Sequence, residues 1–235
     1  MKTLIIIPAF NEESCILKTV NDVLEHNKKY ATDYDVIVIN DGSTDCTEKV
    51  LTDNDIPHIC LIQNLGIGGA VQTGYKYALM NNYDVAIQFD GDGQHDISYA
   101  KDLIDEINNG ADMAIGSRFV SNEQSGFKSS AARRVGIKII SLFIKLFTGK
   151  RVYDPTSGFR ACNKTLIKLF SKSYPTEYPE PVSEVTVLKH KLKISEIPAN
   201  MYERQGGKSS IHAWKNVYYM INVTLAMLAE SLKRY

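Results

Sequence analysis

The sequence predicts an α/β fold in which helices cover both faces of a mostly parallel sheet. Short apolar runs alternate with helix-like segments through the first half of the 235-residue chain. Each apolar run ends in polar or glycine-rich residues, as strands do where they enter loops. With 44% hydrophobic residues and charges spread along its length, the chain can bury a substantial core. One domain with a helical extension at its C-terminus is expected.

The predicted elements alternate in order. The strands are expected in TLIIIPAF, DVIVIND, HICLIQN, DVAIQFD and DMAIGSRF. The helices between them are expected at about 13–27, 44–52, 69–81 and 98–109, where apolar residues recur with helical spacing. In a parallel sheet of this kind, ligands bind at the carboxyl ends of the strands.

All five strand ends carry residues suited to binding. The endings are Asn11-Glu12-Glu13, Asn40-Asp41-Gly42-Ser43, Asn64-Leu65-Gly66-Ile67-Gly68-Gly69, Asp90-Gly91-Asp92 and Gly116-Ser117-Arg118. Asn, Asp, Ser and Gly are also ordinary loop and helix-cap residues, so one ending alone is weak evidence. Five such endings on one rim of a sheet indicate a binding site.

The stretch AIQFDGDGQHD, residues 86–96, places carboxylates at one of these strand ends. Asp90 and Asp92 are separated by one glycine, so both can face one divalent cation while the backbone stays close to a bulky ligand. Hard oxygen ligands favour Mg²⁺ or Mn²⁺, whose shell is usually completed by waters and substrate phosphates. The pattern therefore implies a diphosphate substrate, and the alternative is a solvated Asp-Gly turn.

Composition excludes other classes of function. Lys+Arg and Asp+Glu are equal at 27 each, so no overall field recruits nucleic acid. The cysteines at 15, 46, 60 and 162 form no CxxC pair and no zinc spacing, which suits reduced thiols in a cytoplasmic protein. The apolar run at the N-terminus is too short for a signal peptide and is followed at once by Pro8 and acidic residues.

Six segments in order resemble the family-2 glycosyltransferases with the GT-A fold: IIIPAFNEE, VIVINDGSTDCT, NLGIGGAVQTG, QFDGDGQHD, GSRF and DPTSGFRA. The resemblance is closest to polyprenol-phosphate sugar transferases of the dolichol-phosphate mannose synthase type. It implies an inverting enzyme that moves a sugar from a nucleoside diphosphate to a lipid phosphate. It also implies a GT-A domain at 1–210, with a nucleotide-binding half (1–120) and an acceptor-binding half (121–210), followed by a C-terminal helix at 211–235.

The resemblance implies roles for individual residues. Those expected to bind the nucleotide are Pro8, Ala9, Asn11, Glu12, Asp41, Gly69, Asp90 and Gly91. Within this set, Asp41 would hydrogen-bond the base and Asp90 would face both the ribose and the metal. Asp92 would hold the metal and is also an expected catalytic residue, with Gln94 as a further metal ligand.

Basic residues complete the expected site. Arg118 and Arg134 are expected catalytic residues that meet the diphosphate or the acceptor phosphate, although Arg133 leaves the register of Arg134 open. Arg204 and Lys208, in ERQGGKSS, resemble the family's mobile flap, which closes over the diphosphate and so belongs to the nucleotide site. A plain basic surface loop is the alternative for this segment.

Two family motifs are missing, the ED pair and the QxxRW element of members that lengthen polysaccharides. A hydroxyl acceptor needs a base, whereas an acceptor phosphate is already an anion and needs positive charge and alignment. The absence favours polyprenyl phosphate as acceptor. Glu177, Glu180 and Glu184 are candidates for a base, with a solvated loop as the simpler interpretation. The alternatives are transfer to a sugar hydroxyl of a cell-wall, capsule or other polysaccharide precursor, and a non-catalytic nucleotide-sugar-binding protein.

The segment SSAARRVGIKIISLFIKLFTGK predicts an amphipathic helix at 131–147. At about 100° per residue, Arg134, Lys138, Ser141 and Lys145 fall on one narrow face and apolar residues cover the rest. Such a helix can lie in a membrane interface, and a core helix with one wet face is the alternative. We expect a cytoplasmic protein, peripheral on the inner face of the cell membrane. A small membrane partner protein and a homo-oligomer stay open.

Overall fold

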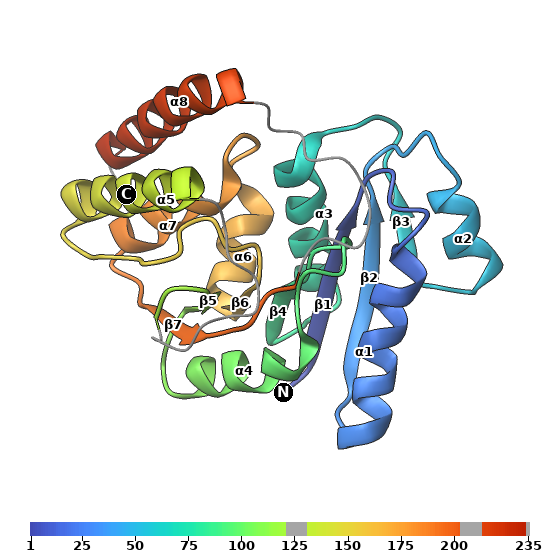
Figure 1. Ribbon diagram of the computed structural model, residues 1–235. Coiled ribbons are helices and arrows are strands. Elements are labelled where there is room, and N and C mark those ends of the chain that lie inside the picture. Colours follow the sequence, from blue (N-terminus) through green and yellow to red (C-terminus); the bar gives the residue numbers. More distant parts are fainter. Residues whose placement is uncertain (121–130, 203–212, 234–235) are drawn as a thin grey trace.

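The computed structural model describes residues 1–120, 131–202 and 213–233, which form a seven-stranded sheet between layers of helices (Figure 1). The strands are β1 (Thr3–Ala9), β2 (Tyr34–Asn40), β3 (His58–Cys60), β4 (Val85–Gln88), β5 (Met113–Ser117), β6 (Arg160–Asn163) and β7 (Ile194–Pro198). Their order is β3-β2-β1-β4-β6-β5-β7, and among these strands β6 alone runs antiparallel to its neighbours. The predicted mostly parallel sheet is confirmed.

Helices follow the first five strands much as the sequence predicts. They are α1 (Ile16–Tyr30), α2 (Thr47–Asp53), α3 (Gly66–Met80), the short 3₁₀ helix η1 (Ile97–Tyr99), α4 (Ala100–Asn108), α5 (Ala131–Thr148), α6 (Lys164–Lys172), α7 (Pro179–Lys189) and α8 (Ala213–Leu232). The expected start of the first helix is wrong by three residues. The chain first makes a turn in which Glu12 O accepts the amides of Cys15 and Ile16, and the helix begins there.

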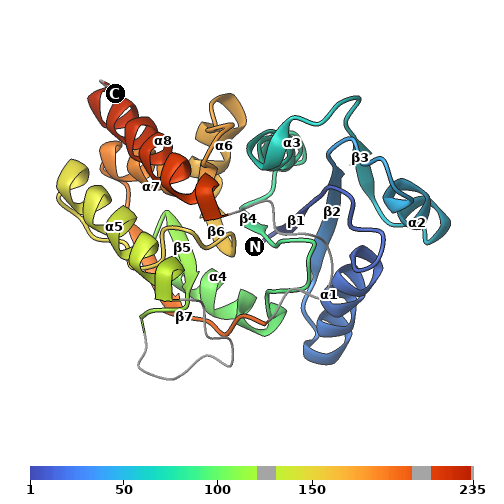
Figure 2. The ribbon, with the colours of Figure 1, turned by 45° about the horizontal axis from the view of Figure 1, so that its top comes forward.

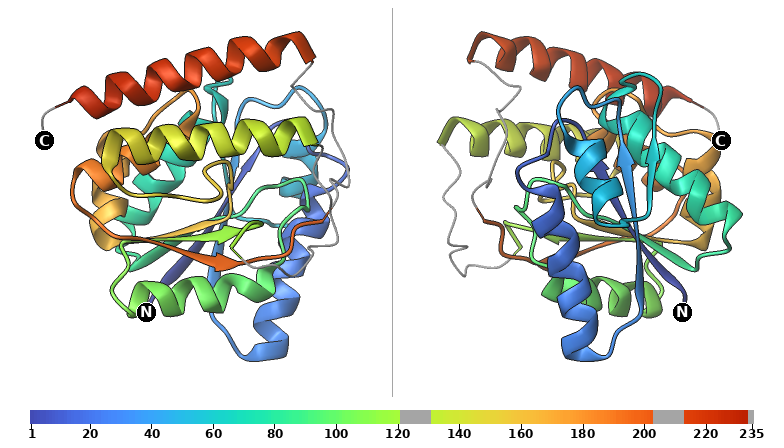
Figure 3. Two further views of the ribbon diagram at one scale, coloured as in Figure 1. Left: turned by 60° about the vertical axis from the view of Figure 1, so that its left-hand side comes forward. Right: turned by 90° about the vertical axis from the view of Figure 1, so that its right-hand side faces the viewer.

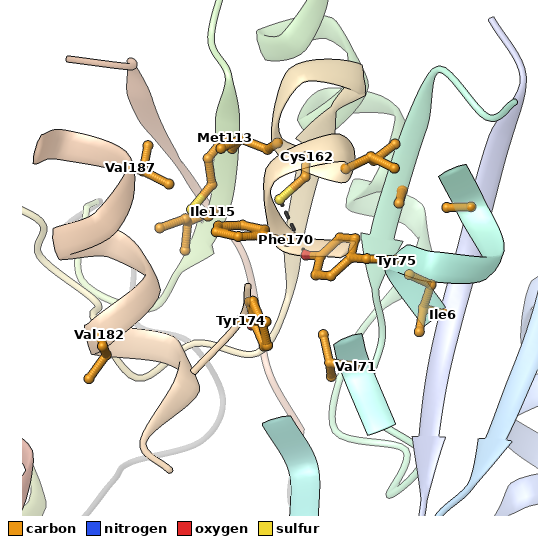
Figure 4. Packing of buried hydrophobic residues seen from close by; sticks show 14 of the residues in the cluster. Ile6, Val71, Tyr75, Met113, Ile115, Cys162, Phe170, Tyr174, Val182 and Val187 are labelled. Atoms are coloured by element: carbon orange, nitrogen blue, oxygen red, sulfur yellow. Dashed lines mark hydrogen bonds between the residues drawn. The ribbon is translucent and has the colours of Figure 1, made fainter. Parts of the chain in front are cut away.

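Successive side chains of a strand point to opposite faces of the sheet, so the core has two parts. Leu4 and Ile6 pack with residues of α3, α6 and α7, whereas Ile5 and Ile7 pack with residues of α1, α2 and α4. Figure 2 shows α3 and α6 on one side of the sheet and α1 and α4 on the other. On the first side, the hydroxyl of Tyr75 lies 3.3 Å from the Cys162 sulfur inside the apolar cluster (Figure 4).

Helices α5 and α8 lie side by side outside α7 (Figure 3). One side of α5 completes the core through Ile137, Ile140 and Ile144, which are buried. Ser141 is buried with them and donates a hydrogen bond to Val152 O. The expectation that Ser141 shares the exposed basic face is therefore wrong, because the adjoining loop offers its hydroxyl a carbonyl acceptor.

Candidate active site

The carboxyl ends of β1 and β2 are joined by their loops. Asp41 N donates to Ala9 O at 2.8 Å, which continues the strand pairing by one residue beyond β2. Asn11 has a left-handed backbone (φ 56°). Its side-chain oxygen accepts a hydrogen bond from Thr44 N at 2.8 Å, and its backbone N–H donates one to Ser43 Oγ at 3.0 Å. Asn11 thus fixes the rim on which the predicted nucleotide residues Pro8, Ala9 and Asp41 lie.

Glu12 is held between the same two loops. Its amide donates to Thr47 Oγ1 at 3.0 Å, and its carboxylate accepts from the Cys15 thiol at 2.9 Å. Burial raises the pKa of Cys15 to about 12, and the Glu12 carboxylate and, more weakly, Asp92 add to the rise. The thiol is thus a hydrogen-bond donor to Glu12, beside the loop that contains the predicted metal ligands.

Asp41 is buried, with 3% of its surface exposed, and its Oδ1 accepts a hydrogen bond from Leu65 N at 2.7 Å. Burial raises the pKa of Asp41, although the amides of Leu65 and Gly66 oppose the rise by favouring the carboxylate. Gly69 lies in the first turn of α3, where an added Cβ would be 2.5 Å from Leu65 Cβ. Close packing explains this glycine, and its contact with a nucleotide stays a prediction.

The loop after β4 presents the predicted metal ligands. Asp90 is 31% exposed at its side chain, whereas Asp92 is 3% exposed. Asp92 Oδ1 accepts from Gln94 N at 3.1 Å, a local turn that shapes the loop. The side-chain nitrogen of Gln94 donates to Tyr202 O at 3.3 Å, so its side-chain oxygen is the atom available to a cation. Gly91 is buried between Asp90 and Asp92.

The donor set fits a magnesium or manganese ion that shares its shell with a substrate. Across residues 1–120, 131–202 and 213–233, no group of three or more His, Cys, Asp or Glu side chains could hold a metal alone. A phosphate-bound Mg²⁺ usually has one or two protein carboxylates, and its other ligands are waters and phosphate oxygens. Asp90 and Asp92, with the amide oxygen of Gln94, match that requirement.

Arg118 is part of a buried ion pair that the sequence did not reveal. Its Nε and Nη2 donate to the two carboxylate oxygens of Asp154 at 2.8 and 2.7 Å, and Asp154 is fully buried. Glu196 in turn accepts the amides of Tyr153 and Asp154 at 2.8 and 2.9 Å. Burial raises the pKa of Glu196, although these amides oppose it. Arg118 is thus fixed in position, and its contact with phosphate stays a prediction.

Of the glutamates in TEYPEPVSEV, Glu177 is exposed in the bend before α7, as a solvated loop predicts, whereas Glu180 and Glu184 are not in a loop. Glu180 and Glu184 belong to α7, and Glu184 is fully buried, with its Oε1 3.3 Å from Nη2 of Arg160. The interpretation of Glu184 as an exposed loop residue is wrong. The guanidinium of Arg160 is buried against α7, and Glu184 is buried with it as its ion-pair partner. The DPTSGFR segment therefore supplies both Asp154 and Arg160 to structural ion pairs.

Of the remaining predicted basic residues, Arg134 alone lies in the part of the chain that the structure describes. Arg134 is exposed near the start of α5. Arg204 and Lys208 lie outside the described residues. Their roles in binding phosphate stay predictions.

Comparisons with known proteins identify the family. The profile described as "Glycosyl transferase family 2" matches residues 4–170. The UDP-N-acetylglucosamine–dolichyl-phosphate N-acetylglucosaminyltransferase of Methanococcus voltae is 34% identical, covering 96% of this chain and 97% of its own. The polyprenol monophosphomannose synthase of Mycolicibacterium smegmatis is 28% identical, covering 89% of this chain and 81% of its own.

A solved structure supports the fold. Glucosyl-3-phosphoglycerate synthase from Mycobacterium tuberculosis, in complex with Mn²⁺, UDP and glucosyl-3-phosphoglycerate, superposes with a TM-score of 0.72. The match covers 100% of this chain and 81% of that one at 15% identity, so it concerns the fold alone. Together with the profile match, these findings show that the chain belongs to glycosyl transferase family 2 and is a glycosyltransferase with the GT-A fold.

Proposed function

We propose that this protein transfers a hexose from a UDP- or GDP-sugar to polyprenyl phosphate with the help of Mg²⁺ or Mn²⁺. The observation that carries the proposal is the pair of carboxylates, Asp90 and Asp92, at the carboxyl end of β4 on the sheet edge that also holds Asp41. The relatives named above act, by their names, on dolichyl or polyprenol phosphate. UDP-N-acetylglucosamine is the first donor to test, because one relative's name contains it.

In this mechanism Asp90, Asp92 and Gln94 hold the cation, and Asp41 hydrogen-bonds the base. The cation, when bound, supplies positive charge to the diphosphate leaving group. An oxygen of the acceptor phosphate forms a bond to the anomeric carbon as the bond to the donor diphosphate breaks, and the nucleoside diphosphate leaves with that electron pair. The acceptor is already an anion, so none of the glutamates of α7 has to remove a proton.

Helices α5 and α8 support a membrane-facing surface. Both expose apolar side chains in addition to those that they bury: Val135, Ile139, Leu142, Leu146, Ile221, Leu225, Leu228 and Leu232. Lys138 and Lys145 are exposed on α5 beside this apolar surface. No helix of the described chain is both long and apolar enough to cross a bilayer. We propose that α5 and α8 lie in the membrane interface, where a polyprenyl acceptor is held.

Product analysis tests the function. Purified protein is given UDP-N-acetylglucosamine with polyprenyl phosphate or with a sugar-hydroxyl acceptor, in the presence of Mn²⁺ or EDTA. We expect a lipid-phosphate sugar that forms with Mn²⁺ and not with EDTA, and GDP-, CDP- and dTDP-sugars are tested next. Transfer to the hydroxyl acceptor alone would favour a polysaccharide-precursor enzyme. Binding without hydrolysis or transfer of any donor would favour the non-catalytic alternative.

Charge reversal on α5 tests the membrane surface. Each basic residue near an anionic surface contributes about 1 kcal/mol, so Lys138→Glu/Lys145→Glu should weaken partitioning onto anionic liposomes by about thirtyfold or more at low salt. Liposome co-sedimentation measures this. The matched control is Lys49→Glu/Lys101→Glu on α2 and α4, which pack on the other face of the sheet. Equal loss in both double variants would contradict a specific role for α5.

A further inference from the structure

The Asp90 carboxylate is bounded by three groups from separate parts of the sheet edge. Gln88 Nε2 donates to Oδ1 at 3.2 Å, and His95 Nε2 lies 3.6 Å from Oδ2. On a third side is Gly158, where an added Cβ would lie 2.5 Å from Oδ2. Any side chain at 158 would displace the carboxylate. These contacts allow Asp90 few orientations.

Gln88 is the last residue of β4 and is fully buried. Its register partner on β6 is Arg160, and its side chain also hydrogen-bonds the carboxylate of Glu180 on α7. The side-chain oxygen of Gln88 has no hydrogen-bond partner within the described part of the chain, which is unfavourable for a buried carbonyl. Reversing the amide would bring that oxygen against the Asp90 carboxylate. The amide group is thus oriented by its hydrogen bonds to the carboxylates of Asp90 and Glu180.

His95 contacts both the backbone and the side chain of Asp90. Asp90 N donates to its Nδ1 at 3.2 Å. A backbone N–H can only donate, so this contact assigns the imidazole proton to Nε2, which faces the carboxylate. The ring is 3% exposed, stacks on Phe159 with centroids 5.1 Å apart and meets Phe89 edge-on at 5.6 Å. The two phenylalanines therefore hold the imidazole of His95 in place, and the imidazole in turn holds Asp90.

We propose that Gln88 and His95 are positioning residues that orient the Asp90 carboxylate before the cation and the donor bind. This inference rests on the proposed function, in which Asp90 is a metal ligand. Both side chains meet the carboxylate through a nitrogen, so they orient it without taking the place of the cation. A lysine or arginine at either position would compete with the cation instead. Hydrogen-bonded partners of metal ligands commonly affect metal affinity by 10–100-fold when they are replaced.

The test measures Mn²⁺ binding by electron paramagnetic resonance in the presence of UDP, on the full chain. Gln88→Leu keeps the volume without the donor, and His95→Phe keeps the ring stacking without the nitrogens. We expect each to raise the Kd for Mn²⁺ by about 10–100-fold. The kcat at saturating Mn²⁺ should change much less than the KM for Mn²⁺. Tyr75→Phe, which removes another buried hydrogen-bonding group beneath the same sheet, is the control and should leave the Kd unchanged.

Two further variants are measured in case Gln88→Leu or His95→Phe does not fold. Gln88→Asn keeps an amide on a shorter stem, and His95→Asn keeps an acceptor for Asp90 N without a group that reaches the carboxylate. Folded variants at both positions that bind Mn²⁺ with the wild-type Kd would overturn the inference while leaving the proposed function intact. If wild type binds no Mn²⁺ with either UDP or GDP, the metal-dependent function fails and the inference fails with it.

Discussion

Replacing Asp92 by asparagine should lower sugar transfer about a thousandfold without unfolding the protein. Asparagine keeps the shape and the acceptor for Gln94 N, which donates to Asp92 Oδ1 at 3.1 Å. It loses the charge that binds a hard cation. A catalytic metal contributes several kcal/mol to the stabilisation of the transition state, and each 1.36 kcal/mol is about tenfold in rate. The measurements are kcat, the KM for Mn²⁺ and the thermal unfolding midpoint.

The same loop offers a matched control for this substitution. Asp96 accepts hydrogen bonds from Ser98 N at 2.9 Å and from the Tyr202 hydroxyl at 3.2 Å, so its carboxylate is used in shaping the loop. Asp96→Asn should therefore keep most of the activity. Near-normal turnover of Asp92→Asn at saturating Mn²⁺ would remove Asp92 from the metal site. An equal loss in Asp96→Asn would instead point to a general disturbance of the loop.

Local patterns predicted the half of the fold that is built from βα units. β1, β2, β4 and β5 are apolar runs with clear ends, and the helices between them have regular spacing. β6 and β7 were not recognised, because RACN begins with a charged residue and ISEIP has a glutamate at its centre. The charge at the start of β6 is compensated by Glu184, 24 residues away in the sequence. A pattern read over a few residues contains no information on such a pair.

The candidate site also has a part that local sequence patterns predict and a part that depends on contacts distant in the sequence. Asp90, Asp92 and Gln94 belong to one loop, so their proximity could be predicted from the sequence, and their role as metal ligands stays a prediction. The pairing of Arg118 with Asp154 joins positions 36 residues apart, and the support of Asp154 by Glu196 joins positions 42 apart. Residue types alone do not show whether an arginine meets a substrate phosphate or a buried aspartate. The tertiary contacts are needed to distinguish these two uses.

The largest effect on stability is expected from the loss of Arg160. Its guanidinium is fully buried and donates to Ser157 O at 3.1 Å, to Ser183 Oγ at 3.0 Å and to Glu184 Oε1 at 3.3 Å. Burial opposes its charge, but the Glu184 carboxylate raises the pKa of Arg160 above the ordinary value. Arg160→Met leaves Glu184 buried without its cation. Breaking a buried pair in this way costs about 3–5 kcal/mol of unfolding free energy.

The destabilisation of Arg160→Met should depend on pH. Burial already raises the pKa of Glu184, and Arg160 opposes that rise, so the variant removes the opposing influence. A carboxyl whose pKa is higher in the folded state stabilises the fold below its unfolded pKa of about 4.3, and this stabilisation is lost as the pH rises toward the folded value. Urea unfolding should therefore show a larger loss at pH 8 than at pH 5.

A double variant separates the ion pair from the volume that Arg160 fills. Replacing a buried pair by apolar residues of similar size is often neutral or stabilising, so Arg160→Met/Glu184→Leu should regain much of the stability lost in Arg160→Met at pH 8. The double-mutant cycle is completed by Glu184→Leu, which leaves the guanidinium unpaired and should also be destabilised. A double variant no more stable than either single variant would show that packing, and not the buried charge, makes Arg160 necessary.

Because Arg160 is paired in register with Gln88, which donates to Asp90, loss of the ion pair should also weaken Mn²⁺ binding at Asp90. The double variant should restore less of the Mn²⁺ affinity than of the stability, because it lacks the guanidinium beside Gln88.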